Sequence, residues 1–553
     1  MKPAAARAEI HATLVARGFT IADGSCPTFA GAIRVHGKKV DVLLEVPDTR
    51  LIERPRVHLV DRTQIDPEVL AHVEVDTGIC YASGAGLPLD NMRPGEAILR
   101  ILAEAATTLE RSFKGRGAEE AADEYQQYWH AERHAWSLVP RLGRAGTRTL
   151  DLYKASRSDR KITIISESNM ISGWEAGAPV RGVYIVDTDG RVGPGATLEQ
   201  PKDLATLRTW WVAQAALGHV HWQTIEQKLL ADELCFVFAA NAMIGFRIPP
   251  PRSISSGVKG GRIREAAIPR MMQLVKDKLG LQRWSASDCS LKRITSRNVP
   301  KLAGLTGKKV GLVGCGTIGS HLARMMMQSG AGSDQPLYLF DNDHVAPGNL
   351  GRHLLNLENL GQNKAQALAA ELQRFHPSVQ IKAVDADAVA SWLLLKNCDI
   401  IVDATGDWNV QTNLNELFLE DRGLHLTALL HSWVFANGAG VQSFLNLGDD
   451  KACFRCLKPE FDGKWRYPAA QHDVETEFTP ATCGDGTYAA FSVDAPVMAA
   501  ALANRAILDW ARGQPGQRLR TVAVDLVEGR SHKPVSPEPA ANCPACAALR
   551  ASR

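Results

Sequence analysis

The spacing of hydrophobic and polar residues changes twice along the chain, and the three resulting regions predict different architectures. Residues 32–46 and 56–60 alternate apolar and polar positions, which predicts strands. Residues 94–113 place apolar side chains at helical spacing, with Pro94 where a helix would begin. We therefore predict an α+β domain over residues 1–117.

The second region, residues 118–290, has a weaker pattern. The charged stretch EEAADEYQQYWHAERHAW has helical spacing, and residues 161–166 and 183–186 have the composition of short strands. The PPPR segment and the Ser- and Gly-rich residues after it predict a flexible loop or linker near 249–261. We expect a mixed α/β linker domain whose tyrosine, tryptophan and histidine side chains serve packing.

The third region, residues 291–553, alternates strands with helices. The segment KKVGLVGCGTIGSHLARMMMQSGA predicts a strand, a Gly-rich turn and a helix. Strands are predicted at PLYLFDND, VQIKAVDAD and CDIIVDATGD, with a helix at GQNKAQALAAELQRFHP. This alternation is typical of the α/β class, so we predict a doubly wound, Rossmann-like domain with a parallel sheet.

Composition narrows the class of protein. Of 553 residues, 45% are hydrophobic and 22% charged, as in soluble chains of several domains, and a net charge of +3 indicates neither nucleic acid nor an acidic membrane as partner. No apolar run reaches the roughly 18 to 20 residues that span a bilayer, and the amino-terminal residues lack a signal peptide's apolar core. Eleven cysteines in so long a chain do not indicate a disulfide framework. We therefore expect a cytoplasmic protein.

Three glycines follow the first strand of the third region. Gly314, Gly316 and Gly319 form G-x-G-x-x-G, in which glycine permits a tight turn, the approach of a phosphate and close helix packing. The helix that begins there offers unpaired N–H groups to an anion. Asp341 ends the second strand, where a carboxylate can accept hydrogen bonds from a ribose. These residues predict a nucleotide site.

Polar residues further along the chain favour a triphosphate over NAD(P). Asn349, Arg352 and Lys364 follow Asp341, and Asp403 ends a later strand. Arginine and lysine neutralise phosphate charge, and a carboxylate at a strand end can hold Mg²⁺. Each residue alone could be a solvated surface charge, but the ordered series predicts ATP with Mg²⁺.

The cysteines fall into two classes. Two C-x-x-C pairs late in the chain predict a structural Zn²⁺ site with four thiolates, the alternative for either pair alone being a redox dithiol. Its ligands are Cys453, Cys456, Cys543 and Cys546. Cys483 lies instead in a loop of small residues before an apolar helix over 494–508, where a thiol can be a nucleophile or simply buried. We regard Cys483 as a candidate acyl acceptor.

The series DNDHVAPGNLGRHL, Lys364 and VDATGDWN resembles the adenylation domain of the ThiF/MoeB and ubiquitin-activating enzyme superfamily. The resemblance implies ATP binding, with Asp341 at the ribose, Asn349, Arg352 and Lys364 around the phosphates and Asp403 near magnesium. It also implies a four-cysteine zinc site and, at Cys483, a thioester with the activated protein.

Two features of this resemblance are less regular. His353 stands where the family usually has glutamine. Family members supply a further arginine from a helix just upstream, often across a dimer, and Arg293 or Arg297 could match it. A homodimer is expected on the resemblance alone.

The amino-terminal region resembles the ubiquitin-conjugating fold around its active cysteine, through the stretch that contains GICYASGAGLPLDNMRPGEAILR. The resemblance implies that Cys80 carries the acyl group, although by itself this cysteine could equally be structural. His72 falls where the family has the asparagine of its His-Pro-Asn motif, and a histidine there could donate a hydrogen bond or act as a base. Asp90 is a candidate for positioning the incoming nucleophile.

Both ends together resemble the bacterial fusion of conjugating and activating enzymes found in CBASS antiphage operons. The resemblance implies that the C-terminus of a cGAS-like nucleotidyltransferase, or of another ubiquitin-like protein, is adenylated, passed from Cys483 to Cys80 and joined to an amine of a target. Three other hypotheses stay open. They are a ThiF/MoeB-type enzyme for a sulfur carrier, a nucleotide-binding scaffold and an NAD-dependent oxidoreductase.

Overall fold

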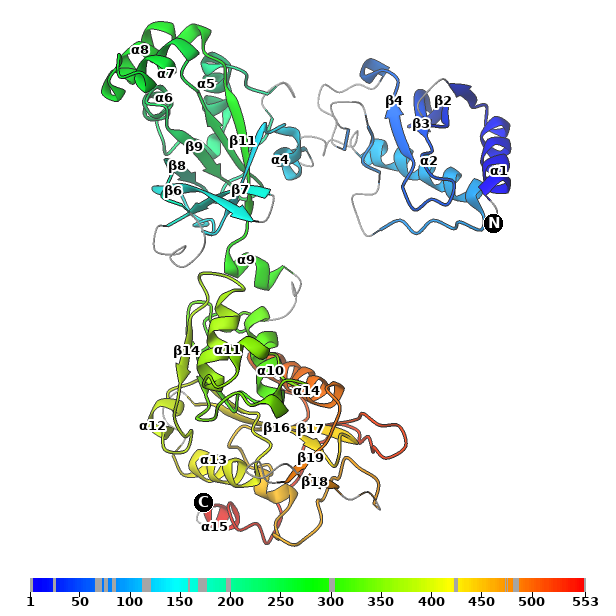
Figure 1. Cartoon of the computed structure of the whole chain (residues 1–553). Coiled ribbons are helices and arrows are strands. Elements are labelled where there is room, and N and C mark those ends of the chain that lie inside the picture. Colours follow the sequence, from blue (N-terminus) through cyan, green and yellow to red (C-terminus); the bar gives the residue numbers. More distant parts are fainter. Residues whose placement is uncertain are drawn as a thin grey trace. The chain divides into compact units, whose positions relative to one another are not determined.

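The computed structural model forms two compact units, Met1–Asp288 and Cys289–Arg553 (Figure 1). The structure describes residues 3–22, 26–64, 72–73, 78–81, 86–111, 121–157, 160–167, 177–194, 200–297, 304–421, 426–472, 474, 476–480 and 487–551. Cys483 lies outside these ranges.

Unit 1 begins with a four-stranded antiparallel sheet and two helices that share one hydrophobic core. Its elements are α1 (Pro3–Ala16), β1 (Thr20–Ala22), β2 (Thr28–Val35), β3 (Lys38–Glu45), β4 (Arg56–Leu59), η1 (Arg62–Gln64) and α2 (Pro94–Arg111). The predicted helix at 94–113 is confirmed as α2, and its apolar side faces the core. The helix α1 was not predicted.

The predicted strand at 32–46 is instead parts of two strands. Residues His36 and Gly37 both have positive φ, of 47° and 78°. Two such residues form the type I′ turn that joins twisted antiparallel strands, so β2 and β3 pair as a hairpin.

The second half of unit 1 is a closed barrel with the strand order β10-β11-β5-β7-β6-β8-β9. Its strands are β5 (Arg133–Ser137), β6 (Gly146–Arg157), β7 (Arg160–Ser166), β8 (Arg181–Asp187), β9 (Leu234–Phe238), β10 (Met243–Arg247) and β11 (Gln282–Asp288). Its helices are α4 (Tyr125–Tyr128), α5 (Leu204–Ala213), η3 (Ala215–Leu217), α6 (Trp222–Leu230), α7 (Arg252–Lys259), η4 (Glu265–Ala267), α8 (Ile268–Val275) and η5 (Lys276–Lys278).

Two predictions for this region are corrected and one is confirmed in part. The flexible loop expected near 249–261 contains the helix α7, in which Ile254 is buried. The charged helical stretch ends early, because residues 133–137 form β5, which lies between β11 and β7 in the barrel. The packing prediction is confirmed for Trp129, Trp210 and Trp211, which lie in one core outside the barrel, but not for Trp136 or for the histidines of this region, which are exposed.

Unit 2 is built on a seven-stranded sheet with the order β14-β13-β12-β15-β16-β17-β20. Its sheet strands are β12 (Val310–Val313), β13 (Leu337–Phe340), β14 (Ile381–Val384), β15 (Ile400–Asp403), β16 (Ala428–Phe435), β17 (Gly440–Asn446) and β20 (Leu519–Ala523), and β18 (Phe478–Pro480) pairs with β19 (Thr487–Ala489). The α-helices are α9 (Leu291–Ser296), α10 (Thr317–Gln328), α11 (Lys364–Gln373), α12 (Trp392–Leu395), α13 (Trp408–Glu420), α14 (Asp494–Ala511) and α15 (Ala547–Ala551). Short 3-10 turns are η6 (Pro347–Asn349), η7 (Leu357–Asn359) and η8 (Phe454–Leu457).

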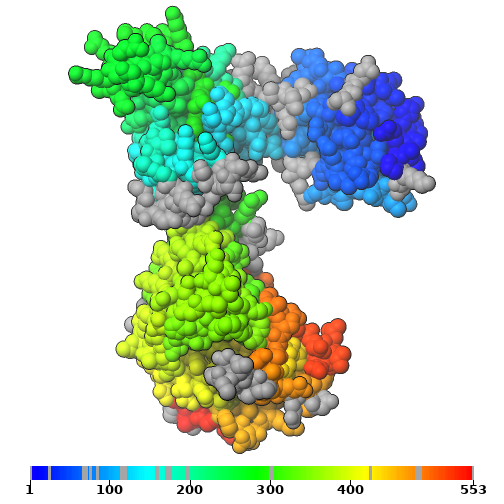
Figure 2. Space-filling view, in the orientation of Figure 1, coloured from blue at the N-terminus to red at the C-terminus, as the bar shows by residue number. Residues whose placement is uncertain are grey.

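Helices cover both faces of this sheet, as a doubly wound fold requires. Alternate strand residues face opposite sides, so Leu312 packs in the core under α10, α11 and α14, whereas Val313 packs in the core under α12 and α13. In Figure 2, the part of unit 2 between about residues 300 and 400, coloured green to yellow-green, forms one continuous face.

The sheet is not wholly parallel. The five strands from β14 to β16 run parallel, but β17 and β20 are antiparallel. The connection from β16 to β17 is too short for a crossover and turns through Ala436 and Gly438, which have φ of 50° and 91°. The carboxyl ends of the parallel strands therefore form the edge on which the predicted nucleotide site lies. Among the described helices, none is both long and apolar enough to cross a membrane.

Candidate functional site

The three glycines after β12 have three different environments. Gly314 has a φ of 85°, and a Cβ there would lie 3.0 Å from the backbone nitrogen of Thr405. At Gly319 a Cβ would lie 1.8 Å from the carbonyl oxygen of Gly314. A Cβ at Gly316 would meet no heavy atom within 4 Å. Gly314 and Gly319 are thus needed for packing, and Gly316 leaves open space at the amino end of α10.

Asp341 is tied to this glycine turn by its carboxylate. Its Oδ2 accepts a hydrogen bond of 2.7 Å from the backbone N–H of Cys315, and its Oδ1 accepts one of 2.9 Å from that of Asp343. The side chain of Cys315 is fully buried, as expected for a small residue that fits the turn, and burial raises the pKa of its thiol. The predicted carboxylate therefore lies beside the glycine turn.

Lys364 lies at the same place with little access to solvent. It begins α11, is 7% exposed and pairs with Asp343. Burial raises the pKa of Asp343, but the hydrogen bonds from Lys364 and from the N–H of His344, together with the charge of Lys364, outweigh it and leave that pKa below its usual value. Asp343 pairs with Lys364, and its backbone N–H donates to Oδ1 of Asp341 at 2.9 Å, so the structure brings these two predicted residues together around Asp343.

Asn363 supports this arrangement and was not predicted. Its Nδ2 donates to the carbonyl of Asp341 at 2.8 Å and to Asp385 Oδ1 at 2.9 Å, and its Oδ1 caps α11 by accepting from the N–H of Gln366 at 3.0 Å. An asparagine immediately before a helical pattern is an N-cap signal and could have found it.

Asn349 and Arg352 hold other contacts in this structure. Asn349 Oδ1 accepts from the N–H of Ala346 at 2.9 Å and so closes the η6 turn. The guanidinium of Arg352 lies 4.3 Å from the ring centroid of Phe491, and its NH1 donates to the carbonyl of Ala489 at 3.4 Å. Arg352 is therefore held by the segment that follows β19.

His353, where glutamine was expected, supports the glycine turn directly. Its Nδ1 accepts from the N–H of Leu355 at 3.0 Å, so its Nε2 carries the proton and donates to the carbonyl of Cys315 at 2.6 Å. Burial is the main reason why the pKa of His353 falls to about 4. His353 is thus a neutral donor that holds the turn.

Asp403 does not have the environment expected of a magnesium ligand. It is fully buried, its Oδ2 lies 2.7 Å from Nδ1 of His431, and its Oδ1 accepts from Oγ1 of Thr405 at 2.7 Å. Both carboxylate oxygens are thus bound by protein groups. Asp403 instead fixes the loop that carries Thr405 against Gly314.

The exposed carboxylate at this strand end belongs to Asp407, which was not predicted. It caps α13, with its Oδ1 accepting from the N–H groups of Asn409 and Val410 at 2.8 and 2.9 Å. It lies two residues beyond Thr405, the residue that contacts the glycine turn. An acidic residue immediately before a helical pattern is also an N-cap signal, and this signal could have found Asp407.

The four late cysteines come together as predicted. The Sγ atoms of Cys453, Cys456, Cys543 and Cys546 are buried and all lie within 4.8 Å of one another, and three of the six pairs are separated by 3.4, 3.6 and 3.8 Å. Tetrahedral Zn²⁺ with Zn–S bonds of about 2.3 Å would separate its sulfurs by about 3.8 Å. The cluster therefore fits a structural zinc ion.

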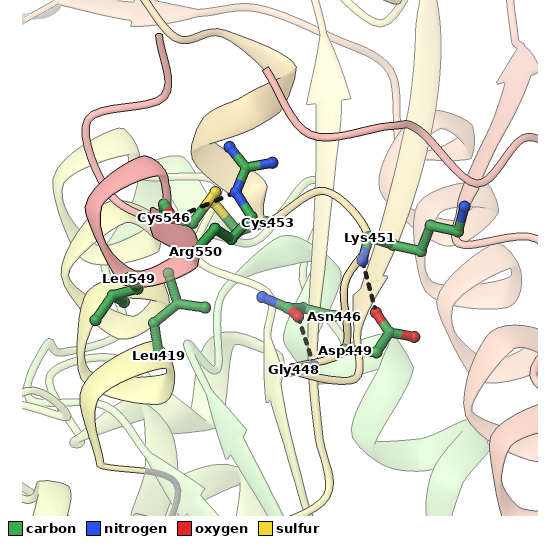
Figure 3. A pocket seen from close by; sticks show the side chains of 9 residues that line it. All are labelled: Leu419, Asn446, Gly448, Asp449, Lys451, Cys453, Cys546, Leu549 and Arg550. Carbon is green, nitrogen blue, oxygen red and sulfur yellow. Dashed lines mark hydrogen bonds between the residues drawn. The ribbon is translucent and has the colours of Figure 1, made fainter. Parts of the chain in front are cut away.

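A small pocket lies beside this cluster (Figure 3). It is lined by Leu419, Asn446, Gly448, Asp449, Lys451, Cys453, Cys546, Leu549 and Arg550. Nε of Arg550 donates to the carbonyl of Cys546 at 3.3 Å, which ties α15 to its cysteine pair. The cluster thereby joins α15 to the body of unit 2.

The structure brings His72 and Cys80 together in unit 1. The N–H of Cys80 donates to the carbonyl of His72 at 2.8 Å, and Cys80 is half-buried. Asp90 is exposed and accepts from the N–H of Met92 at 2.8 Å in the turn before α2. Arg293 and Arg297 lie on α9 and at its end.

Comparison with known families assigns both ends of the chain. Residues 291–545 match the ThiF family, and residues 5–137 match Prokaryotic E2 family B.

Individual proteins are similar to this chain over different parts of its length. The chain is 25% identical to the ATP-dependent ubiquitin transferase-like protein Cap2 of Pseudomonas aeruginosa (strain BWHPSA011 / Pa011), over 99% of this chain and 100% of that protein. It is 31% identical to the protein of the same name from Vibrio cholerae serotype O1, over 42% of this chain and 39% of that protein. Among solved structures, Escherichia coli MccB with ATP aligns with 54% of this chain and 86% of its own at 17% identity and a TM-score of 0.35.

The cysteine cluster predicts that the purified protein contains zinc. We expect about one zinc ion per chain by atomic absorption, and Cys456→Ser to lose the ion and lower the unfolding temperature of unit 2, because such ions contribute folding free energy. Cys26→Ser, a half-buried cysteine of unit 1, is the control and should keep the metal. Full zinc content in the Cys456→Ser protein would contradict the assignment.

Buried neutral His353 makes the stability of unit 2 depend on pH. Its pKa is about 4 in the folded chain against about 6.5 when unfolded, so between these values the unfolded state binds the additional proton. The contribution of His353 is complete above about pH 6.5 and is lost as the pH falls towards 4, by up to about 3 kcal/mol.

We therefore expect His353→Gln, which keeps a donor for the Cys315 carbonyl but does not titrate, to weaken the pH dependence of the urea-unfolding free energy between about pH 7 and about pH 4.5. His344→Gln removes an exposed histidine of the same unit and should leave the pH dependence of the unfolding free energy as in the wild type. Equal pH dependence in the wild type and His353→Gln would show that His353 is not the titrating group.

Proposed function

Because this chain joins a Prokaryotic E2 family B domain to a ThiF family domain, we propose that it is an ATP-dependent transferase for a ubiquitin-like substrate. It activates the C-terminal carboxylate of a protein partner by adenylation and transfers the acyl group to an amine through thioesters. The observation that carries this proposal is the open space at Gly316 beside Asp341 and Lys364.

The geometry around the glycine turn suits the phosphates of ATP. Gly316 precedes the first turn of α10, whose free N–H groups favour an anion. Lys364 supplies a cation that is already desolvated, and phosphate would replace Asp343 as its partner. Asp341 is placed for the ribose, with part of its acceptor capacity used by the turn itself. Arg352 would exchange Phe491 and Ala489 for phosphate oxygens.

Asp407 is the residue that would hold Mg²⁺ with the phosphates. Its carboxylate is exposed and oxygen ligands suit this ion, whereas both oxygens of Asp403 are taken by His431 and Thr405. Bound with ATP, Mg²⁺ neutralises phosphate charge and orients the triphosphate.

Adenylation needs no acid or base from the chain. An oxygen of the partner's terminal carboxylate attacks the α-phosphorus, the bond to the bridging oxygen breaks, and pyrophosphate leaves with the electron pair. Lys364 and Arg352 stabilise the charge that develops on the phosphoryl oxygens. The product is an acyl-adenylate.

Two cysteines then carry the acyl group. The thiolate of Cys483 attacks the acyl carbon and AMP leaves, and the thiolate of Cys80 next displaces that of Cys483 by transthioesterification. An amine of the target finally attacks the Cys80 thioester, giving an amide, the Cys80 thiolate and a proton. The role of Cys483 rests on the family resemblance alone. The role of Cys80 is supported in addition by its contact with His72.

The proposed partner is a cGAS-like nucleotidyltransferase that presents its C-terminus, with a homodimer of this chain acting in the cytoplasm. Support comes from the full-length similarity to a protein named Cap2. A ThiF/MoeB-type enzyme for a sulfur carrier is the alternative. The E2 family match over residues 5–137 favours conjugation, since sulfur transfer needs no second acyl acceptor.

Nucleotide chemistry is tested by Gly316→Ala. We expect this protein to fold as the wild type does, because the new methyl group meets no atom, but to bind ATP at least about tenfold more weakly in calorimetry because the methyl fills the phosphate space. ATP–pyrophosphate exchange with candidate C-terminal peptides should fall in parallel. Gly280→Ala, equally open and in unit 1, is the matched control. Unchanged ATP binding, or binding of NAD instead, would refute the proposal.

The relay is tested by removing each thiol in turn. With ATP and a candidate partner, we expect Cys80→Ala to form the Cys483 thioester but no conjugates, and Cys483→Ala to form the adenylate but no thioester on either residue, as seen by intact mass spectrometry. Cys26→Ser should behave as the wild type. Conjugation at a normal rate by Cys80→Ala would refute the relay, and charging of Cys80 in Cys483→Ala would show that the first acceptor is misassigned.

A further inference from the structure

The Cys80 site contains two side chains that come from beyond α2, Glu124 and Tyr128. Nδ1 of His72 lies 3.0 Å from Oε1 of Glu124. The backbone N–H of His72 donates to the hydroxyl of Tyr128 at 2.7 Å, and this hydroxyl donates to Oε2 of Glu124 at 3.1 Å. His72, Tyr128 and Glu124 therefore form a closed ring of polar contacts.

This ring is anchored in the core outside the barrel. Tyr128 is 6% exposed and belongs to the core that contains Trp129 and Trp211, so its hydroxyl has a fixed position. Burial is the main reason why the pKa of Tyr128 is raised, so this hydroxyl stays protonated and can donate to Glu124. The backbone N–H of Cys80 donates to the carbonyl of His72 at 2.8 Å, which joins the cysteine to this ring.

The ring also stabilises an uncommon backbone conformation. His72 has a φ of 61°, in a left-handed region that non-glycine residues seldom adopt because it is strained. The bond from its N–H to Tyr128 and the bond from the N–H of Cys80 to its carbonyl hold it there. Such strain persists where the surroundings fix a residue for a purpose.

We propose, on the basis of the function proposed above, that Glu124 is a positioning residue which sets His72 as the proton acceptor for the amine that attacks the Cys80 thioester. Nδ1 of His72 lies 3.0 Å from the carboxylate of Glu124, a separation that favours the tautomer with its proton on Nδ1 and leaves Nε2 as the acceptor nitrogen. The hydrogen bond from His72 is also the main reason why the pKa of Glu124 is lowered, which keeps the carboxylate ionised.

The step is balanced without any further reagent. The amine nitrogen bonds to the thioester carbon, the proton of the attacking amine passes to Nε2 of His72, and the carbon–sulfur bond breaks as the Cys80 thiolate leaves. His72 then returns the proton to solvent. Ionised Glu124 stabilises the imidazolium that forms in between.

The experiment uses the full chain and loads Cys80 without ATP. An aryl thioacetate transfers its acetyl group to the Cys80 thiolate with release of the aryl thiolate, and peptide mass spectrometry follows the acetyl group on Cys80. Discharge is measured with two probes, free lysine and hydroxylamine. Lysine is protonated at neutral pH and needs a base, whereas hydroxylamine is already a free nucleophile.

We expect Glu124→Gln to slow discharge to lysine by about tenfold or more, as loss of assistance to a general base does, and to change discharge to hydroxylamine by less than about twofold. Asp123→Asn is the matched control, since Asp123 is the adjacent carboxylate and is mainly exposed, paired with Arg191. It should leave both rates unchanged. His72→Ala should reproduce the selective effect of Glu124→Gln.

The outcomes separate this inference from the proposed function. Equal slowing of both nucleophiles by Glu124→Gln would mean that Glu124 only supports the loop, and unchanged rates would mean that it has no part; either result overturns the inference. Discharge from wild-type Cys80 no faster than from Cys26 would instead reject Cys80 as an acyl carrier, and with it the relay.

Discussion

The approach of two backbones at the glycine turn is the constraint on which unit 2 depends. The place of a Cβ at Gly319 is taken by the carbonyl of Gly314, and that at Gly314 by the backbone of Thr405. Because these residues touch, β12, α10 and the end of β15 share one corner at the carboxyl edge of the sheet. Buried His353 and Asp403 reinforce this corner from either side, one through Cys315 and the other through Thr405. The charges proposed to meet ATP are arranged around a backbone that has little freedom.

Much of this corner could be predicted from sequence, because the features that build it are local. Three glycines at fixed spacing after a strand, an acid at the end of the next strand and two C-x-x-C pairs each carry their own signal, and the structure places them as expected. Asp403 stays a prediction as a residue near magnesium, because two acids lie at or just after the end of the same strand. Only the fold shows that His431, 28 positions later, takes the first of them and leaves Asp407 exposed.

Unit 1 was less predictable, for physical reasons. The prolines before residues 252–259, and the serines and glycine within them, gave no helical pattern in the sequence. In the structure these residues form a helix whose Ile254 is buried. The barrel depends on pairings between distant strands, such as β5 with β11, which no local pattern reveals. The contact of His72 with Glu124 also joins residues far apart in the chain, and a lone histidine carries no signal for the carboxylate that will orient it. Tertiary proximity, and not composition, creates this part of the site.

The cysteine cluster has a topological consequence. Its two pairs lie 90 positions apart in the chain. A bound ion would therefore clasp the two ends of the intervening chain together and close it into a loop. This loop includes β18, β19, α14 and Cys483. A segment clasped at both ends loses less entropy when it is displaced and returns than a free tail would. The clasp would therefore hold both ends of this stretch against the body of unit 2, while α14 and β20 between them are packed in its core and sheet.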